Sequence, residues 1–173
     1  DFKQGNVNEA LNHFKSSYAK SPDFGTAVYI AKTLVRLQRV EEGADVLVKE
    51  LARSHSPNKR QYNIVAEYLN KFNFHEQAIR VYENLERRFT LTPEEYNNIS
   101  DVNLKLNRLD LAEDYIKMAL AEKRLPLFLM TYSEVQLKKG NNDLAEQALL
   151  ETLKSDESNE HANVLLASVY VKQ

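Results

Sequence analysis

Histidine is the residue type whose spacing in this chain comes nearest to a known catalytic pattern. The stretch HEQAI, residues 75–79, begins like the helix of a zinc protease, in which two histidines four residues apart bind the metal from one helical face. Ile79 stands where the second histidine would be, so the stretch lacks a metal ligand. The other histidines, His13, His55 and His161, fall in separate segments. We therefore predict no metal site and no catalytic histidine.

The remaining residue types add no support for catalysis. The chain has no cysteine, which excludes a thiol nucleophile, a cysteine metal site and a disulfide framework. Its glycines form no phosphate-binding cluster, since Gly5 and Gly140 each open a short polar turn. Carboxylates are plentiful, but they sit on polar faces and in first helical turns, where capping and solubility explain them. We expect neither enzymatic activity nor a cofactor.

Charge and hydropathy narrow the class of partner. The 173 residues carry a formal net charge of -2 with a pI near 6.1, unlike basic proteins that bind nucleic acids or anionic membranes. Apolar runs such as LPLFLM are far shorter than the roughly 20 residues that span a bilayer. We expect no nucleic-acid partner and no membrane insertion in this fragment. The lack of cysteine is compatible with a bacterial cytoplasm or periplasm, and the compartment stays open.

The elements that position any binding residue follow a fixed period. The prolines are 35, 36 and 33 residues apart, at Pro22, Pro57, Pro93 and Pro126. Three of them follow a hydroxyl residue, in SPDF, SPNK and TPEE, and the Ser of SNEH continues the series. A hydroxyl N-cap followed by proline at the first helical position predicts a helix start about every 34 residues. In TPEE, Thr92 and Glu95 are expected to complete a capping box.

A second series of small residues marks another helix in each period. These residues lie 33 to 35 positions apart and each follows a short polar turn: Ala10, Gly43, Ala78, Ala112 and Ala145. A large apolar residue comes four positions after each of them: Phe14, Leu47, Tyr82, Ile116 and Leu149. This spacing puts both on one helical face, where the small residue permits close approach and the large one fills the space beside it.

Together these features resemble the tetratricopeptide repeat, a 34-residue unit of helix, turn and helix. The expected first helices also carry a large residue followed by a small one, as in Ile30-Ala31 and Val65-Ala66. The resemblance implies an all-α, right-handed α-solenoid (superhelix) of antiparallel helix pairs, with four full repeats flanked by two half repeats. Polar Asn103 and Gln136 depart from the family's aromatic position, and we expect looser packing in those copies.

The repeat pattern also sets the expected boundaries. We predict a single domain with a half repeat at 1–21, full repeats at 22–56, 57–91, 92–125 and 126–157, and a half repeat at 158–173. Because a repeat buries its apolar face only against its neighbours, half repeats at both ends lead us to expect a fragment of a longer array. The start DFKQGN, without Met, agrees with this interpretation.

The resemblance implies a groove, lined by the first helix of each repeat, that holds a protein or peptide partner. Projection from the large-small pairs gives the candidate groove residues: Tyr29, Lys32, Arg36, Asn63, Glu67, Lys71, Asn97, Asn98, Asp101, Lys105, Met130, Thr131, Glu134 and Lys138. The asparagines are suited to a peptide backbone because a carboxamide both donates and accepts hydrogen bonds.

One column of the groove is basic in every copy and is open to two interpretations: Arg36, Lys71, Lys105, Lys138 and Lys172. It could recognise an acidic peptide, or its lysines could pair with the carboxylates four residues earlier, Glu67, Asp101 and Glu134. The spacing favours local pairing. The Lys and Asn clamp by which some family members bind acidic chaperone tails is absent from the corresponding positions.

We conclude that the sequence predicts a non-enzymatic scaffold for protein-protein interaction. Two alternatives are carried with it. The first is self-assembly into a homo-oligomer through the terminal half repeats. The second is the pentatricopeptide repeat, which reads RNA one base per repeat, although the spacing and the pI fit it poorly.

Overall fold

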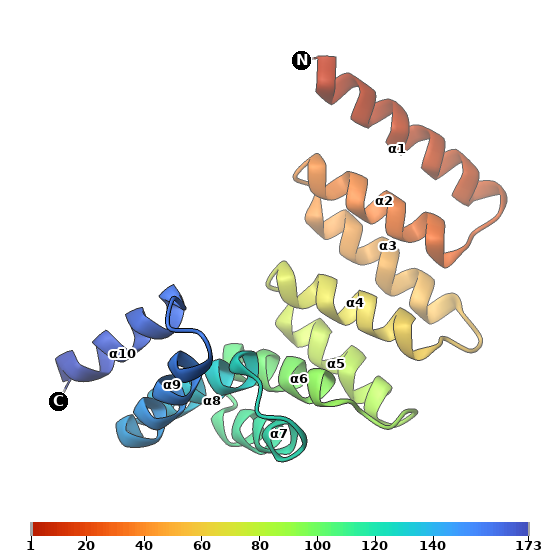
Figure 1. The fold of residues 1–173 in the computed structure, drawn as a ribbon. Helices are drawn as coiled ribbons and strands as arrows, with labels where there is room; N and C mark the ends of the chain where they lie inside the picture. Colours follow the sequence, from red (N-terminus) through yellow and green to blue (C-terminus); the bar gives the residue numbers. More distant parts are fainter. Residues whose placement is uncertain (1, 173) are drawn as a thin grey trace. The chain divides into compact units, whose positions relative to one another are not determined.

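A computed structural model of the chain describes residues 2–172, with side chains from residue 5 to residue 171. These residues contain ten α-helices and no strand (Figure 1). The helices are α1 (Phe2–Lys20), α2 (Phe24–Arg36), α3 (Val40–Arg53), α4 (Lys59–Lys71), α5 (His75–Glu86), α6 (Pro93–Lys105), α7 (Leu109–Glu122), α8 (Pro126–Lys139), α9 (Asn142–Ser155) and α10 (Glu160–Lys172). The prediction of an all-α repeat fold is confirmed.

The helices divide into two compact units, one up to Phe89 and one from Thr90 onward. In the first unit α1 to α5 each pack on the next helix, and in the second α6 to α10 do the same. Four antiparallel pairs recur, α2 with α3, α4 with α5, α6 with α7 and α8 with α9 (Figure 1). The assignment of the chain to one domain with the repeat boundaries given above stays a prediction.

The first helices of the pairs begin 33 to 35 residues apart, but their caps differ from the expectation. Thr92 forms the predicted capping box, with Glu95 N donating to its side chain and the Glu95 carboxylate accepting from Thr92 N. The serines of SPDF and SPNK do not cap. Asp23 and Asn58, just beyond the prolines, accept from backbone N–H groups instead. Asp and Asn are about as good caps as Ser, and each of these helices begins two residues later than predicted.

The turn within each pair depends on one residue with left-handed backbone. The positive φ angles are 60° at Gln38, 66° at Asn73, 58° at Asn107 and 80° at Gly140. They recur at the repeat period, at the place where the chain reverses into the second helix. Gly and Asn adopt this conformation readily, whereas a glutamine costs roughly 1–2 kcal/mol there.

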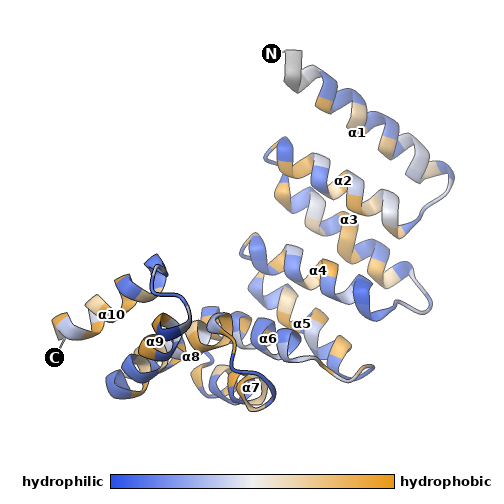
Figure 2. Ribbon diagram, viewed as in Figure 1, coloured by the Kyte–Doolittle hydropathy of each residue, from blue (hydrophilic) through white to orange (hydrophobic). Residues whose placement is uncertain are grey.

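Small residues allow the paired helices to approach closely. Gly43 of α3 is buried, and a Cβ at this position would lie 2.1 Å from the Tyr68 hydroxyl and 3.4 Å from the Ala31 Cα. Tyr68 reaches across from α4 to donate to the Val40 carbonyl at 3.0 Å. Figure 2 shows hydrophobic residues in patches along each helix, with hydrophilic residues between them. Many of the apolar residues, such as Leu69 and Leu85, are buried against the neighbouring helices, whereas others, such as Leu127 and Val164, are exposed.

Each unit has its own apolar core. In the first unit Leu11 of α1 packs with Ile30 and Leu34 of α2. In the second, Ile116 and Ala119 of α7 meet Phe128 of α8, and a further cluster joins α8, α9 and α10. Asn103 and Gln136 are almost fully buried despite their polarity. Asn103 returns its amide to the Ile99 carbonyl at 2.9 Å, and Asn141 donates to Gln136 Oε1 at 2.8 Å.

Ion pairs fix α8, which carries several candidate groove residues, against α7. Lys139 Nζ lies 2.7 Å from Asp110 Oδ1 and 2.5 Å from Glu113 Oε2, and Lys117 Nζ lies 2.5 Å from Glu113 Oε1. The hydrogen bonds from Lys117 and Lys139 lower the pKa of Glu113 from its usual 4.5 to about 2. In the first unit a comparable contact holds α1, because the Tyr18 hydroxyl donates to the buried Glu50 of α3.

The left-handed turn at Gln38 gives a first prediction. Gln38→Gly should raise the free energy of unfolding by about 0.5–1 kcal/mol, because glycine adopts the left-handed conformation without the steric cost that glutamine has there. Part of this gain is lost because glycine increases the conformational entropy of the unfolded chain. Gln147→Gly, in the exposed face of α9, is the matched control and should lower it by about 1 kcal/mol. Urea unfolding followed by circular dichroism measures both. Destabilisation by Gln38→Gly would contradict the turn assignment.

Glu113 gives a second prediction, on pH. Its folded-state pKa is depressed, so the stability that its carboxylate contributes is present above pH 4.5 and is lost as the pH falls from 4.5 to about 2. Glu113→Gln should therefore be less stable than the parent chain by about 1 kcal/mol at pH 7, and the difference should vanish near pH 2. Urea titrations at a series of pH values test this, with Glu122→Gln at the exposed end of α7 as control. A difference independent of pH would contradict the ion network.

Candidate functional site

Six of the predicted groove residues surround one cleft in the second unit. The cleft has a volume of about 560 Å³ and lies between α6, α8 and the start of α10. We call it the α6–α8 cleft. The predicted residues among its lining are Asn97, Asn98, Asp101, Met130, Thr131 and Glu134.

Helix geometry explains why these side chains gather. On α6, Asp101 follows Asn97 by four residues and Asn98 by three, so it shares a face with each of them. On α8, Leu127, Thr131 and Glu134 follow at four- and three-residue spacing and form a second wall. The capping box at Thr92 fixes where α6 begins, and the ion pairs of Lys139 fix α8 against α7. The fixed start of α6 and the fixed end of α8 therefore determine which of their residues reach the cleft.

Asn97 is the most unusual residue of the cleft. Its side chain is 4% exposed, and its Oδ1 atom is buried and accepts no hydrogen bond within the described residues. A buried carboxamide oxygen without a donor costs roughly 1–3 kcal/mol. Asn103 Oδ1 and Gln136 Nε2 are also buried without a partner, but of these three residues Asn97 lines the cleft. A half-turn about χ2 exchanges the positions of Oδ1 and Nδ2, so the same side chain can present either atom to a ligand.

Charge in the cleft is predominantly acidic. Glu134 has a half-buried side chain, and its Oε1 lies 3.5 Å from His161 Nε2. Burial raises the pKa of Glu134 above its ordinary value, while nearby His161 opposes this shift. Asp101 Oδ2 pairs with Lys105 Nζ at 2.7 Å, as the local-pairing interpretation expects. Lys138 does not pair with Glu134; it donates instead to the Leu104 carbonyl on α6, at 3.3 Å.

Two of the predicted residues form the floor of the cleft. Met130 is buried in a cluster with Leu149 of α9 and Leu166 of α10. Thr131 is also nearly buried and returns its hydroxyl to the Leu127 carbonyl at 3.3 Å. Both side chains are already engaged within the fold, so they give the cleft its shape.

The first unit holds three other predicted residues around a separate cleft. Tyr29, Lys32 and Arg36 of α2 line about 470 Å³ together with residues of α1. The ring of Tyr29 stacks on Phe14, with centroids 5.5 Å apart. Tyr29 is 58% exposed, so most of its surface remains available to a partner.

The predicted residues of α4 line neither of these clefts. Asn63 is half-buried, whereas Glu67 and Lys71 are exposed. Lys71 Nζ lies 5.8 Å from the centroid of the Phe72 ring, within the range of a cation–π contact. The side chain of Lys172, the last member of the basic column, lies outside the described residues.

Sequence reasoning missed the contribution of α10 to the α6–α8 cleft. Asn159 accepts from Ala162 N at 2.9 Å and caps α10, which brings His161 beside Glu134. The signal was present in SNEH, since the first turn of each new helix lies over the preceding pair. An isolated histidine near a helix start does not by itself indicate this role.

The described residues also bear on metal binding and on membrane insertion. Residues 2–172 contain no group of three or more His, Cys, Asp or Glu side chains arranged to hold a metal ion. Among the described helices, each is too short or too polar to cross a bilayer.

Comparison with known proteins identifies the fold. A tetratricopeptide repeat protein from Parabacteroides merdae has a TM-score of 0.80 and 15% identity, over 98% of this chain and 68% of that chain. YrrB, a TPR protein with an unusual peptide-binding site, has a TM-score of 0.66 and 16% identity, over 94% and 84%. The second TPR domain of human RPAP3, in complex with the HSP70 peptide SGPTIEEVD, has a TM-score of 0.58 and 16% identity, over 63% and 92%.

No protein-family model matches the chain, and no curated protein does. At these identities the likeness is one of fold. The chain therefore has the tetratricopeptide repeat fold that its period and small-residue pattern predict.

The orphan oxygen of Asn97 gives a third prediction. Asn97→Leu should raise the free energy of unfolding by about 1 kcal/mol, because the same branched set of side-chain heavy atoms is kept and an unsatisfied buried polar group is removed. Asn98→Leu, at the neighbouring half-buried position, should change it by less than about 0.5 kcal/mol. Urea unfolding measures both. A loss of stability in Asn97→Leu would show that the carboxamide serves the fold.

Proposed function

We propose that this chain is a non-enzymatic scaffold that binds an extended segment of a partner protein in the α6–α8 cleft. The observation that carries the proposal is Asn97, which lines the cleft with a buried carboxamide oxygen that lacks a donor. Such a group costs stability in the free protein, and a bound partner that donates a hydrogen bond to it would recover that cost. Two proteins of the same fold are described with bound or bindable peptides, which supports this class of ligand.

The two asparagines would contact the backbone of the segment. A peptide unit offers one N–H donor and one C=O acceptor, and a carboxamide complements both. Asn97 and Asn98 are adjacent on α6, so successive peptide units of an extended chain lie within their reach. Backbone contacts provide affinity without fixing the sequence of the segment.

Charge favours a basic side chain on the segment. Lys105 is held by Asp101 and Lys138 by the Leu104 carbonyl, so these two members of the basic column are engaged within the chain. Glu134 Oε1 lies 3.5 Å from His161 Nε2, while Lys105 and Lys138 act on this carboxylate more weakly and form no ion pair with it within the described residues. A lysine or arginine placed beside Glu134 would give this half-buried carboxylate a full cation partner. This argument favours a basic segment over the acidic one considered from sequence.

The cleft also offers apolar contact. Leu127 at its edge is 62% exposed, and Met130 forms the floor below it. The aliphatic stem of a lysine or a neighbouring leucine of the segment would cover Leu127. The remaining candidate residues, Tyr29, Lys32 and Arg36 in one cleft and Asn63, Glu67 and Lys71 on α4, are proposed as additional contacts for longer segments.

A basic probe tests the proposed function. The probe is the blocked peptide Gly-Lys-Leu-Lys-Leu-Lys-Leu-Gly, titrated into the ¹⁵N-labelled chain while amide and carboxamide resonances are followed by NMR. Shifts should centre on Asn97, Asn98 and Glu134. Glu134→Gln and Asn97→Leu should each weaken binding about tenfold, equivalent to about 1.4 kcal/mol for one charged or buried hydrogen bond.

Glu122→Gln is the matched control for loss of one carboxylate. It lies at the exposed end of α7, outside the cleft lining, and should leave the affinity within about twofold. Equal weakening by Glu122→Gln and Glu134→Gln would indicate attraction to net charge alone. Shifts confined to residues outside the α6–α8 cleft would contradict the proposal.

A further inference from the structure

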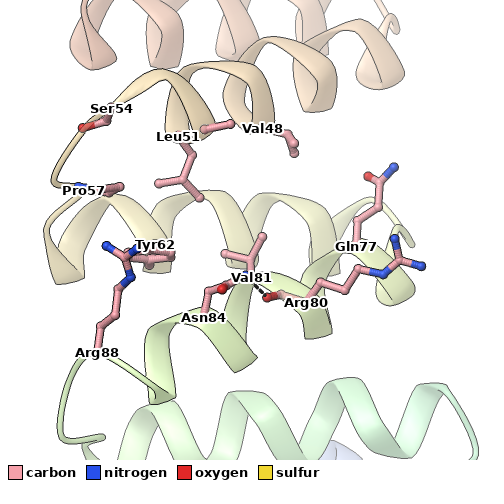
Figure 3. Close-up of a pocket in the computed structure, with 11 residues that line it drawn as sticks. Val48, Leu51, Ser54, Pro57, Tyr62, Gln77, Arg80, Val81, Asn84 and Arg88 are labelled. Carbon is pink, nitrogen blue, oxygen red and sulfur yellow. Dashed lines mark hydrogen bonds between the residues drawn. The ribbon is translucent and has the colours of Figure 1, made fainter.

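A second cleft lies entirely within the first unit. It has a volume of about 470 Å³ and is formed by α3, the loop that follows it, the start of α4 and α5 (Figure 3). None of the groove residues predicted from sequence lines it. We call it the α3–α5 cleft.

The floor of the α3–α5 cleft is apolar. Leu51 of α3 and Val81 of α5 face one another across it, and Tyr62 and Pro57 close one end (Figure 3). Leu51, Val81 and Tyr62 are nearly buried, whereas Val48 at the rim is 37% exposed. An opening of this size above an apolar floor accommodates one aliphatic or aromatic side chain.

Two arginines flank this floor without a carboxylate partner. Arg80 and Arg88 extend to either side of Val81 (Figure 3), and neither forms an ion pair within the described residues. Three other arginines of the chain are held by carboxylates: Arg39 by Glu42, Arg53 by Glu50 and Arg124 by Glu151. The two guanidinium groups at the cleft therefore keep their paired N–H donors for an external anion.

Amide groups continue the polar rim between the arginines. Asn84 Nδ2 donates to the Arg80 carbonyl at 2.8 Å, which fixes its carboxamide one helical turn from Arg80. Gln77 lies beside Arg80, at the end of the cleft away from Arg88 (Figure 3). The carboxylates of α5, Glu76, Glu83 and Glu86, are absent from the lining of this cleft. The rim thus carries positive charge and amide groups around an apolar floor.

We infer that the α3–α5 cleft binds a partner-protein segment in which one large apolar side chain, of leucine or phenylalanine type, is flanked by carboxylates. The apolar side chain covers Val48, Leu51 and Val81, and the carboxylates pair with Arg80 and Arg88. Planar guanidinium groups accept a carboxylate through two parallel hydrogen bonds, which fixes its orientation as well as its charge. This site is independent of the α6–α8 cleft and takes a ligand of opposite charge.

An acidic probe tests the inference on the whole chain. The probe is the blocked peptide Gly-Asp-Glu-Leu-Phe-Glu-Asp-Gly, titrated into the ¹⁵N-labelled protein. Its shifts should centre on Val48, Gln77, Arg80 and Asn84. The double variant Arg80→Glu with Arg88→Glu should weaken binding about tenfold, because two exposed charge pairs each contribute up to about 1 kcal/mol. Both side chains are exposed, so circular dichroism should show an unchanged fold.

Matched controls separate this site from general attraction of an acidic peptide. Arg87→Glu makes the charge change of one of these two substitutions, beside Arg88 but outside the cleft lining, and it should alter the affinity by less than about twofold. Replacing Leu-Phe by Ala-Ala in the probe should weaken binding at least about tenfold, since the large apolar side chain that would fill the cleft is lost. The basic probe should leave the resonances of Arg80 and Asn84 unchanged.

Four results would overturn the inference. The first two are chemical-shift changes that lie outside residues 48–88, and no shift change at millimolar concentrations of the acidic probe. The third is a loss of affinity in Arg87→Glu equal to that of the double variant. The fourth is a single-stranded oligonucleotide of the same charge that binds these residues more tightly than the acidic probe does. Sedimentation of the chain alone tests whether a second copy of the chain occupies this cleft. Self-association that is abolished by the Arg80 and Arg88 double variant would assign the surface to a second copy of this chain instead.

Discussion

Close approach of paired helices through small residues is the constraint on which the rest of this structure depends. At Gly43 an added Cβ would lie 2.1 Å from the Tyr68 hydroxyl of the next pair, so the Tyr68 side chain would have to move. A helix pair of this size cannot bury its apolar face alone, so each must be docked against a neighbour. The left-handed residue in each turn, such as Asn73 or Gly140, then sets how the second helix returns along the first. These two features recur in the repeats and maintain the fold. The exposed residues of each repeat can therefore differ from those of the next.

Both proposed binding sites consist of residues that vary between the copies of the repeat. The α6–α8 cleft places an orphan carboxamide and a half-buried carboxylate around an apolar floor. The α3–α5 cleft has a similar apolar floor with two arginines at its rim. If both proposals hold, one scaffold binds segments of opposite charge at separate places. The self-assembly and RNA-binding alternatives stay predictions.

The sequence predicted the architecture well because the packing constraint acts on local, periodic positions. Small residues such as Ala112 and Ala145, and the cap at Thr92, are each specified within a few residues of the chain. Cap positions failed where two capping residues competed, as Ser21 and Asp23 do, since the choice depends on backbone geometry. Whether Lys138 pairs with Glu134 or reaches the Leu104 carbonyl depends on a neighbouring helix. Whether Arg80 has a carboxylate partner likewise depends on how the carboxylates of α5 point relative to the cleft, and no short sequence pattern predicts this.

The central claim is that Asn97 is kept for a ligand at a cost to the fold. The most direct test is the side-chain amide of Asn97 in the NMR spectrum of the chain saturated with the basic probe. The account predicts nuclear Overhauser contacts between the Asn97 Nδ2 protons and the backbone of the probe, together with slowed exchange of those protons with water. A carboxamide resonance that does not move at saturation, with the probe bound elsewhere, would contradict it.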